Sequence, residues 1–296
     1  MSARVAFFTP SYRGDFQRFR LLRKSITKFY QGESTHYVVV PKDDQRLFSE
    51  LVEAGDRNLV VAVENAYLSR IYYPSTWYPI AARFLPAWRL HRYAGAPGWI
   101  KQQVLKLSAD LVAPDDAFVV CDSDLVFLRA FGPGDLGLSP AARCLFRHDP
   151  KLESARSRGF MESARKLLQL PPGNTDYHYV NWATVLYSDW LKALRHYLEE
   201  RHRRPWQAVL RYAEGLSEYC LYGVFVEEIL RPERVRIQTA PTFYGIWDRD
   251  SYADLFAGDK LETALGGHLA LVIQSNLGIP ATDYEERLTD YLGLAA

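Results

Sequence analysis

The feature that most constrains this chain is an apolar run that two aspartates interrupt. Residues 118–128 are hydrophobic except for a break at Asp122, Ser123 and Asp124. An apolar strand interior cannot hold two ionised carboxylates, so we expect the strand to end at this break. Open α/β sheets bind ligands beyond the carboxyl ends of their strands, and carboxylates placed there can meet a cation. A plain turn is the alternative, since a second Asp-x-Asp triplet at 248–250 follows no such strand.

Strand-like and helix-like stretches alternate on either side of this break. Strands are predicted at 5–9, 36–40, 59–63, 118–121, 179–187 and 269–274. Helices are predicted at 19–29, 98–107, 151–170, 189–202, 205–214 and 217–230, with a last one that starts at a capping box, 282–285. Residues 67–93 lack a clear period, so we expect an irregular insertion or short helices near a cleft there. The alternation predicts an α/β fold with a mixed, mostly parallel sheet flanked by helices.

Length and composition suit one large domain. The chain has 296 residues, of which 48% are hydrophobic, which is ample for a substantial core. We expect a single domain over 1–296, in which 1–130 form a nucleotide-binding half and 131–296 an attached substrate-binding half. Aromatic residues make up 14% of the chain, and such residues also form flat platforms for sugar rings.

Charge and cysteine usage exclude several classes of protein. With 36 basic and 35 acidic side chains, the chain has no general attraction for nucleic acid. The three cysteines, Cys121, Cys144 and Cys220, lie far apart in apolar surroundings, which argues against disulfides and cysteine zinc sites and favours a reducing cytoplasm. The amino-terminal apolar stretch is too short for a signal peptide, and no window approaches the roughly twenty apolar residues of a spanning helix.

Familiar catalytic motifs in their usual context are absent from the sequence. It has no Walker loop, nucleophile elbow or His-Glu-x-x-His, and its Gly-x-Gly-x-x-Gly at 132–137 neither directly follows a predicted strand nor opens a predicted helix. Dinucleotide oxidoreductases, P-loop kinases, serine hydrolases and zinc proteases therefore lose support.

Four groups of residues remain as candidates for chemistry. Asp122 and Asp124 offer hard oxygen ligands that suit Mg²⁺ or Mn²⁺, and such an ion offsets charge on a departing diphosphate. His268 follows two glycines and can approach a metal or phosphate, although a single His is more often an ordinary hydrogen-bonded residue. Glu218 opens a helix capped by Ser217 or a neighbour, where it either complements the helix dipole, which the sequence favours, or acts as a general base.

A fourth group lies on the predicted helix at 98–107. Gln102, Gln103 and Lys106 cluster away from its apolar stripe, so we expect them to point outward together. An ordinary solvated helix face is the alternative explanation.

With these residues placed, the sequence resembles the GT-A class of nucleotide-sugar-dependent glycosyltransferases. More narrowly, it resembles a little-characterised bacterial family of such enzymes associated with polysaccharide biosynthesis. The resemblance spans nearly the whole chain in one order. It is carried by Thr9-Pro10-Ser11-Tyr12 with Asp15, Gly98-Trp99-Ile100-Lys101-Gln102-Gln103 with Lys106, Cys121-Asp122-Ser123-Asp124, Ser217-Glu218-Tyr219 with Tyr222-Gly223, and His268 with Gln274-Ser275.

The resemblance implies a GT-A-like fold with a nucleotide-sugar-binding half, 1–130, and an acceptor-binding half with C-terminal elements, 131–296. It implies that Mn²⁺ or Mg²⁺ is bound by Asp122, Asp124 and His268, with Asp124 the more direct ligand. It places Thr9, Tyr12 and Asp15 by the nucleoside, and Glu218 as the base on the acceptor side. By the donor sugar or phosphate it places Gln102, Gln103, Lys106, Asp122 and Ser123. The chain lacks the fuller basic C-terminal signature of some retaining families.

The resulting hypothesis is a metal-dependent glycosyltransferase in bacterial surface polysaccharide synthesis. It would move a sugar from a nucleoside-diphosphate donor to a hydroxyl of a glycan or lipid-linked acceptor, with inversion if Glu218 is the base. We expect it in the cytoplasm, and a lipid-linked acceptor would place it as a peripheral protein at the inner face of the cell membrane.

Two alternatives belong to other classes of protein. A sugar nucleotidyltransferase would use the same strand-end aspartates, but it would normally have a more glycine-rich and basic loop after the first strand than residues 10–15. A noncatalytic carbohydrate-binding protein would explain the aromatic residues without Glu218.

Overall fold

Two apolar strands form the centre of the main sheet. The computed structural model describes residues 4–86, 94–139, 141–148, 155–239, 243–256 and 261–294. β1 (Val5–Pro10) and β4 (Ala117–Cys121) are buried almost throughout and pair in parallel. The sheet order is β3-β2-β1-β4-β7, with β2 (Thr35–Val40) and β3 (Leu59–Val63) parallel and β7 (Ala183–Tyr187) antiparallel to β4. Continuous apolar strands are what a parallel sheet covered on both faces requires.

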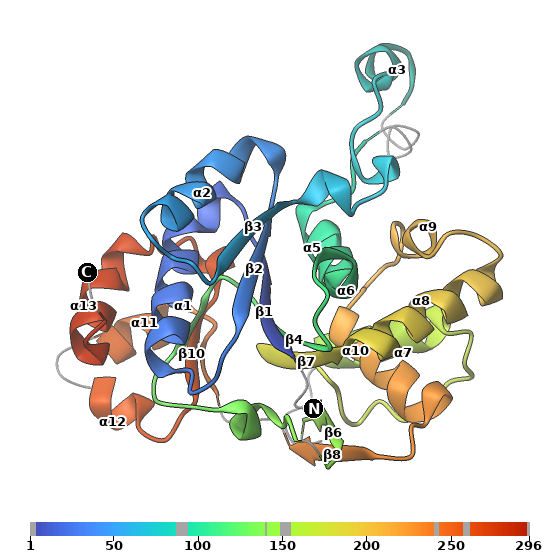
Figure 1. Cartoon of the computed structure of the whole chain (residues 1–296). Helices are drawn as coiled ribbons and strands as arrows, with labels where there is room; N and C mark the ends of the chain where they lie inside the picture. The colour runs from blue at the N-terminus through green and yellow to red at the C-terminus, as the bar shows by residue number, and fades with distance from the viewer. Residues whose placement is uncertain are drawn as a thin grey trace.

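Helices cover both faces of this sheet, as Figure 1 shows. On one side lie α1 (Phe16–Phe29), α2 (Gln45–Glu53) and α13 (Thr282–Leu292). On the other lie α5 (Gly98–Lys106), α6 (Ala109–Val112) and α8 (Ser188–His202). The predicted mixed, mostly parallel sheet flanked by helices is confirmed. The strand order reverses direction between β1 and β4, which is where open α/β sheets bind ligands.

Two smaller sheets lie beside the main one. β5 (Leu125–Phe127) pairs antiparallel with β10 (Ala270–Ile273), which also pairs in parallel with β9 (Phe243–Ile246). β6 (Arg143–Arg147) pairs in parallel with β8 (Val235–Thr239). Strands were not predicted from the sequence at β5, β6, β8 and β9. The two halves also exchange strands, because β7 joins the sheet of the first half and β5 pairs with the last strand.

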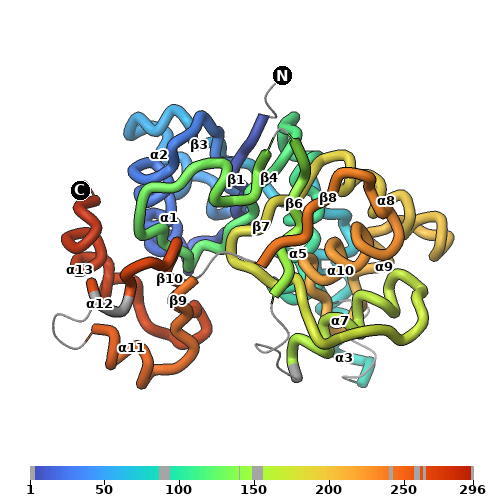
Figure 2. Tube along the Cα trace, turned by 90° about the horizontal axis from the view of Figure 1, so that it is seen from below, coloured from blue at the N-terminus to red at the C-terminus, as the bar shows by residue number. Residues whose placement is uncertain are grey.

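The remaining helices lie mainly in the second half of the chain. They are α7 (Ala155–Leu167), α9 (Trp206–Leu210), α10 (Glu218–Val224), a π-helical segment (Phe225–Leu230), α11 (Arg249–Phe256) and α12 (Leu261–Leu265). Single 3₁₀ turns occur at Arg13–Asp15, Lys42–Asp44, Glu64–Ala66, Arg70–Tyr72, Pro133–Leu136 and Ser275–Leu277. Figure 2 shows α7 to α10 gathered on one side of the sheets and α11 to α13 on the other.

Several predicted boundaries differ from the structure. The strand expected from residue 179 begins at Ala183, and the helix expected over 217–230 divides into α10 and the π-helical segment. The predicted capping box is wrong, because the cap of α13 is Ala281, whose side chain cannot accept a hydrogen bond. Residues 151–154 of the helix predicted from 151 lie outside the described residues.

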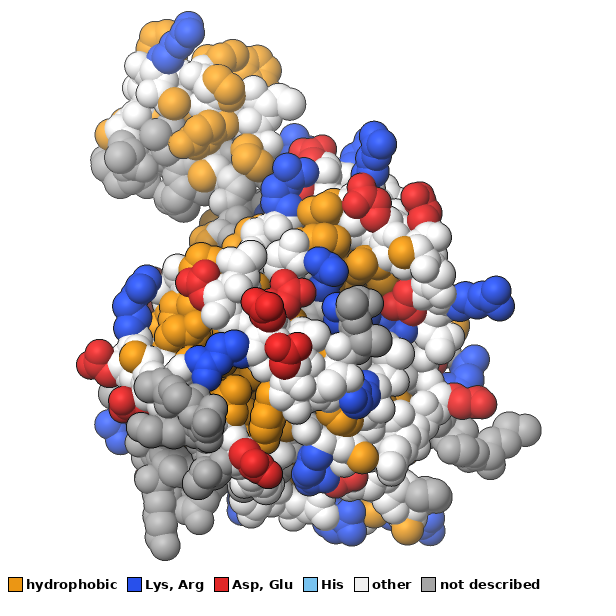
Figure 3. All heavy atoms as spheres, turned by 90° about the vertical axis from the view of Figure 1, so that its left-hand side faces the viewer, with side chains coloured by type: hydrophobic (Ala, Val, Ile, Leu, Met, Phe, Trp, Pro, Cys, Tyr) orange, Lys and Arg blue, Asp and Glu red, His pale blue; other side chains and the backbone are white. Residues whose placement is uncertain are grey.

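The segment after β3 projects from the body as an arm, which we define as residues 70–86 (Figures 1 and 3). It contains one 3₁₀ turn and α3 (Tyr78–Phe84), in line with the short helices expected there. The base of the arm is fixed, because the buried Tyr72 hydroxyl donates to the Gln207 carbonyl at 2.7 Å. Within the described residues, no helix has the length and apolar character needed to cross a bilayer.

Candidate active site

The chain passes from one sheet to another at the aspartate pair. β4 ends at Cys121 and β5 begins at Leu125, so Asp122, Ser123 and Asp124 form the connection between them. Cys121 is fully buried, whereas 37% of the Asp122 side chain is exposed. The apolar run therefore breaks at the carboxyl end of a buried strand, as the sequence predicted.

Lys106, at the end of α5, connects Asp122 with Glu218. Its Nζ lies 2.6 Å from Asp122 Oδ1 and 2.7 Å from Glu218 Oε1, and it donates to the Tyr219 hydroxyl at 3.1 Å. Only 2% of the Lys106 side chain is exposed. Burial by itself would lower the pKa of Lys106, but Asp122, Glu218 and Tyr219 outweigh it and raise the pKa well above its usual value. The lysine is therefore a permanently charged, fixed cation beneath Asp122.

Glu218 is equally buried, with 1% of its side chain exposed. It starts α10, and the Ser217 side chain caps this helix by accepting from the Cys220 amide, as expected. Burial raises the pKa of Glu218, with Lys106 acting against this shift and Asp122 adding to it. Gln103, also buried, accepts from the Glu218 amide at 3.0 Å. The carboxylate predicted as the base is thus enclosed and paired with Lys106.

Asp124 faces the end of β10. Its side chain accepts from the Ser275 amide at 3.1 Å, and its carbonyl accepts from the Ile273 amide. Burial is the largest cause that raises the pKa of Asp124, to about 7, and the charge of Asp122 adds to it. A positive charge close to Asp124 would therefore stabilise its ionised form.

A third carboxylate comes from the loop after β1. Asp15 is buried and pairs with Arg18 at 2.8 Å, and Arg18 also donates to the Ile279 carbonyl at 2.7 Å. Burial raises the pKa of Asp15 despite Arg18, and Asp122 raises it further. A hydrogen bond from Arg18 to Tyr284 links this group to α13. Neither Arg18 nor Tyr284 was singled out from the sequence, because only the fold brings them to Asp15.

We call Asp15, Asp122, Asp124 and Glu218 the carboxylate cluster. Its four carboxylates face two cations, Lys106 and Arg18, so the cluster has two surplus negative charges when all groups are ionised. Among the described residues, no three His, Cys, Asp or Glu side chains are arranged to hold a metal ion. The donor set nevertheless fits Mg²⁺ or Mn²⁺, which need only one or two carboxylates when phosphate oxygens and water complete the shell.

His268 lies at the other end of β10 from Asp124. It precedes Ala270, which pairs with Phe127, whereas the contacts of Asp124 are with Ile273 and Ser275. The strand of roughly five residues between them spans about 16 Å at 3.3 Å per residue. The His268 ring instead packs edge-on against Tyr244. The structure therefore does not bring His268 to the aspartates, and the Ser275 amide stands at the position nearest to them.

The other predicted donor residues divide into exposed and enclosed groups. Tyr12 is 45% exposed, and the charge of Asp15 raises its pKa. Thr9 is fully buried and bonded to the His36 ring, and Ser123 donates to the Ser11 hydroxyl at 2.9 Å. Thr9 and Ser123 therefore fix the strand ends and do not face solvent.

The polar residues of α5 do not point outward together as expected. Gln102 is partly exposed, but Gln103 and Lys106 are 6% and 2% exposed. The correction has a physical reason, since both buried side chains are satisfied by Glu218, which lies more than a hundred residues later in the chain.

Two tryptophans stand at the same edge as the aspartates. In the antiparallel β4–β7 pair, Cys121 opposes Ala183, so Asp122 and Trp182 emerge at one end. Ile273 opposes Ile246 in β10 and β9, so Trp247 emerges next to the segment that contacts Asp124. The two indole rings are 5.7 Å apart, and Trp247 is 52% exposed. They form an accessible aromatic pair beside the carboxylate cluster.

The family of this chain follows from its sequence. The model of the family of unknown function DUF6492 matches residues 7–296. The chain belongs to the DUF6492 family. No curated protein matches it.

Three solved structures that are similar to this DUF6492 chain are glycosyltransferases. Apo mouse xyloside xylosyltransferase 1 aligns at 11% identity and a TM-score of 0.47, over 95% of this chain and all of that one. The galactosyltransferase LgtC, in complex with donor and acceptor sugar analogues, aligns at 10% identity and 0.48, over 98% and 96% of the two chains. The apo bifunctional glycosyltransferase WbbM aligns at 12% identity and 0.48, over 92% of this chain and 46% of its own.

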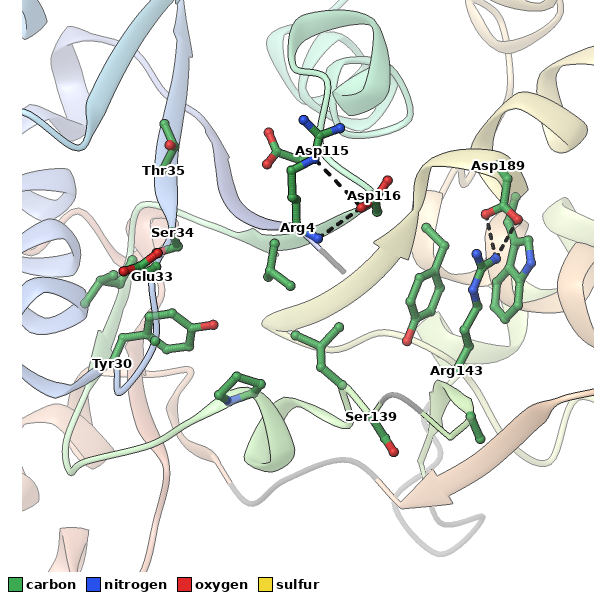
Figure 4. A pocket seen from close by; sticks show the side chains of 18 of the residues that line it. Arg4, Tyr30, Glu33, Ser34, Thr35, Asp115, Asp116, Ser139, Arg143 and Asp189 are labelled. Atoms are coloured by element: carbon green, nitrogen blue, oxygen red, sulfur yellow. Dashed lines mark hydrogen bonds and ion pairs between the residues drawn. The ribbon is translucent and has the colours of Figure 1, made fainter. Parts of the chain in front are cut away.

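The DUF6492 chain also has an open cavity at the amino edge of the main sheet (Figure 4). The cavity has a volume of about 1350 Å³ and includes Arg4, Asp116, Arg143 and Asp189 in its lining. Arg143 lies 2.6 Å from Asp189, and the Arg4 guanidinium lies 3.9 Å from Asp116. These charges neutralise one another in exposed pairs, unlike those of the carboxylate cluster.

Proposed function

We propose that this chain is a glycosyltransferase that moves a sugar from a nucleoside-diphosphate donor to a hydroxyl of a glycan or glycolipid acceptor. The observation that carries the proposal is the carboxylate cluster at the reversal of strand order between β1 and β4. A negatively charged site attracts an anionic diphosphate only when a cation accompanies it. The sequence resemblance to GT-A enzymes supports the same reaction. It also supports a role in bacterial surface polysaccharide synthesis.

In this proposal Asp122 and Asp124 would hold a divalent cation together with the donor diphosphate. The cation would compensate the charge that develops on the departing nucleoside diphosphate. Asp124 would serve as an ionised ligand there, because a nearby double positive charge would oppose the effect of burial that raises its pKa. His268 has no part in this site, since it lies at the far end of β10.

We propose that Glu218 positions Lys106 and is not the base. A base must reach the acceptor hydroxyl, and 1% of the Glu218 side chain is exposed. Its carboxylate and Gln103 instead fix the end of α5, so that the Lys106 ammonium stays against Asp122. Inversion, which followed from a base at Glu218, is therefore not part of the proposal.

The aromatic pair favours sugar transfer over nucleotidyl transfer. Trp182 and the exposed Trp247 lie at the edge of the aspartates, and indole faces suit the apolar faces of sugar rings. A nucleotidyltransferase would need free basic groups in the loop after β1. Arg13, the only basic residue there, is bonded to Asp44 at 2.6 Å.

Thermal unfolding with nucleotides tests the proposal. UDP, GDP, CDP and CMP would each be added with and without Mn²⁺, and we expect one nucleoside diphosphate to raise the Tm only with the metal. The Asp124→Asn variant should lose this shift. Asp250→Asn, the same change in the exposed second triplet, is the matched control and should keep it.

A transfer assay then separates the candidate reactions. The proposal expects release of nucleoside diphosphate from the matching sugar nucleotide when a hydroxyl acceptor is present. Pyrophosphate release from a nucleoside triphosphate and a sugar 1-phosphate would instead identify a nucleotidyltransferase. If none of the nucleotides shifts the Tm under either condition, the proposed donor site is refuted.

A further inference from the structure

The arm presents an apolar row away from the protein. Trp77, Ile80 and Phe84 are 64%, 50% and 79% exposed. Their spacing of three and seven residues places them on one side of α3. A helix of a globular protein normally buries such a row, whereas here Figure 3 shows hydrophobic side chains gathered on the surface of the projecting arm. Within the described residues nothing covers the row, and such an apolar surface is typical of a binding site.

In the sequence, the charged side chains that flank the row have a single sign. No aspartate or glutamate occurs over residues 65–109, whereas the arm itself contains Arg70 and Arg83. The chain as a whole has a net charge of only +1, so this is a local segregation of charge and not a general excess. A second copy of the arm would bring like charges together, which disfavours self-association through this surface.

The arm is fixed at the sheet edge that carries the candidate site. It follows β3, which runs parallel to β2, β1 and β4, so it leaves the sheet at the carboxyl edge where Asp122 follows β4. The Tyr72 hydroxyl bond to Gln207 and a hydrogen bond from the Ala96 amide to the Tyr72 carbonyl fix both sides of its base. A surface bound by the arm would therefore lie on the side of the carboxylate cluster.

We propose that the arm docks the protein on an anionic lipid surface. Trp77, Ile80 and Phe84 enter the interfacial region, which indole and other aromatic side chains prefer, and arginines meet the lipid phosphates. Charge complementarity and the outward apolar row on one short helix carry this assignment. Lipid binding is independent of the proposed sugar transfer and is tested without any sugar donor.

Vesicle sedimentation tests the proposal with the full chain. Vesicles of phosphatidylcholine with about one third phosphatidylglycerol should pellet the protein, and pure phosphatidylcholine should pellet much less, because juxtamembrane cations add to binding only on anionic lipid. Trp77→Ser/Phe84→Ser should weaken binding at least about ten-fold by removing the interfacial anchors. Arg83→Ala should weaken it about five-fold, with added salt having a similar effect on the wild type.

Matched variants elsewhere on the surface are the controls. Leu111→Ser, at a half-exposed leucine of α6, and Arg234→Ala, at an exposed arginine before β8, should bind as the wild type does. Because the altered side chains are exposed, the Tm should not change; if the double variant melts early, Trp77→Ser and Arg83→Glu replace it. Failure of the wild type to pellet with anionic vesicles, or equal binding by the arm variants, overturns the proposal. A dimer in light scattering that the arm variants dissociate assigns the row to a second copy and also overturns it.

Discussion

Charged side chains are arranged differently at the two edges of the main sheet. At the amino edge, a cavity of about 1350 Å³ is lined by exposed pairs such as Arg143 and Asp189, which neutralise each other. At the carboxyl edge, Asp15, Asp122, Asp124 and Glu218 outnumber Lys106 and Arg18, and much of this imbalance is buried. Water screens the charges at the amino edge. At the carboxyl edge, burial disfavours ionised carboxylates, so these groups are stabilised by a bound proton or a nearby cation. The imbalance of charge, and not the size of the cavity, thus locates the candidate chemistry.

The largest expected effect comes from removing the central cation of the carboxyl edge. Lys106→Met leaves Glu218 buried without its partner, so the free energy of unfolding should fall by about 3–5 kcal/mol. Urea unfolding measures the loss. Adding Glu218→Gln to this variant should recover much of it, since the second change removes the unpaired charge. A loss below about 1 kcal/mol in the single variant would contradict the buried pair.

The raised pKa of Asp124 makes the metal-free protein dependent on pH. The folded pKa of about 7 exceeds the unfolded value near 3.8, so the native state holds the extra proton. Its contribution to stability is complete below pH ~4 and disappears as the pH rises through ~7, a loss of up to about 4 kcal/mol. Urea unfolding of Asp124→Asn should lack this slope, and the variant should exceed the wild type in stability at pH 7 without metal. Equal slopes in both proteins would show that Asp124 titrates normally.

A smaller effect is expected at the aromatic pair. Trp247→Ala should weaken binding of a sugar-bearing ligand by about 1 kcal/mol, a typical value for one aromatic contact. The nucleoside diphosphate alone should bind as before, because in the proposed site the cation held by the aspartates, and not the indole, would contact the diphosphate. Calorimetric titration of both ligands measures the difference. An equal loss for both would mean that Trp247 shapes the whole edge and not a sugar platform.

The smallest effect is expected at the amino edge. Asp189→Asn breaks an exposed pair with Arg143, so it should change the free energy of unfolding by less than about 1 kcal/mol. Metal-linked stabilisation by nucleotides should stay the same, and the thermal assay described above measures both. If this variant abolished nucleotide binding, the comparison between the edges would be broken.

Local sequence patterns determined the parts of the fold that were predicted correctly. The run 118–121 ends where the first aspartate appears, because burial tolerates no unpaired charge, and the structure places the end of β4 there. By contrast, β8 is largely exposed, and buried and exposed residues do not alternate along it. Its sequence therefore lacks the two-residue hydrophobic period from which a strand is predicted. β5 is only three residues long and continues the apolar run of β4 on the far side of the break.

Long-range partners determined the parts of the site that were missed. The sequence places Lys106 on a polar helix face, but its burial depends on Glu218, which only the packed fold brings to it. Similarly, His268 and Ser275 flank the same strand, and only the pairing of β10 with β5 decides which end meets Asp124. Residue type and spacing predicted the aspartates, whereas strand direction and burial decided their neighbours.

The passage of the chain from β4 to β5 has a mechanical consequence. Asp122, Ser123 and Asp124 belong to both sheets at once, and the Asp124 carbonyl accepts from the Ile273 amide of β10. A ligand that immobilises these three residues therefore couples the local unfolding of the two sheets, which can otherwise open separately. Hydrogen exchange should then slow in β10 and β4 together when the ligand binds. The ligand would thus also determine how rigid the connection between the two sheets is.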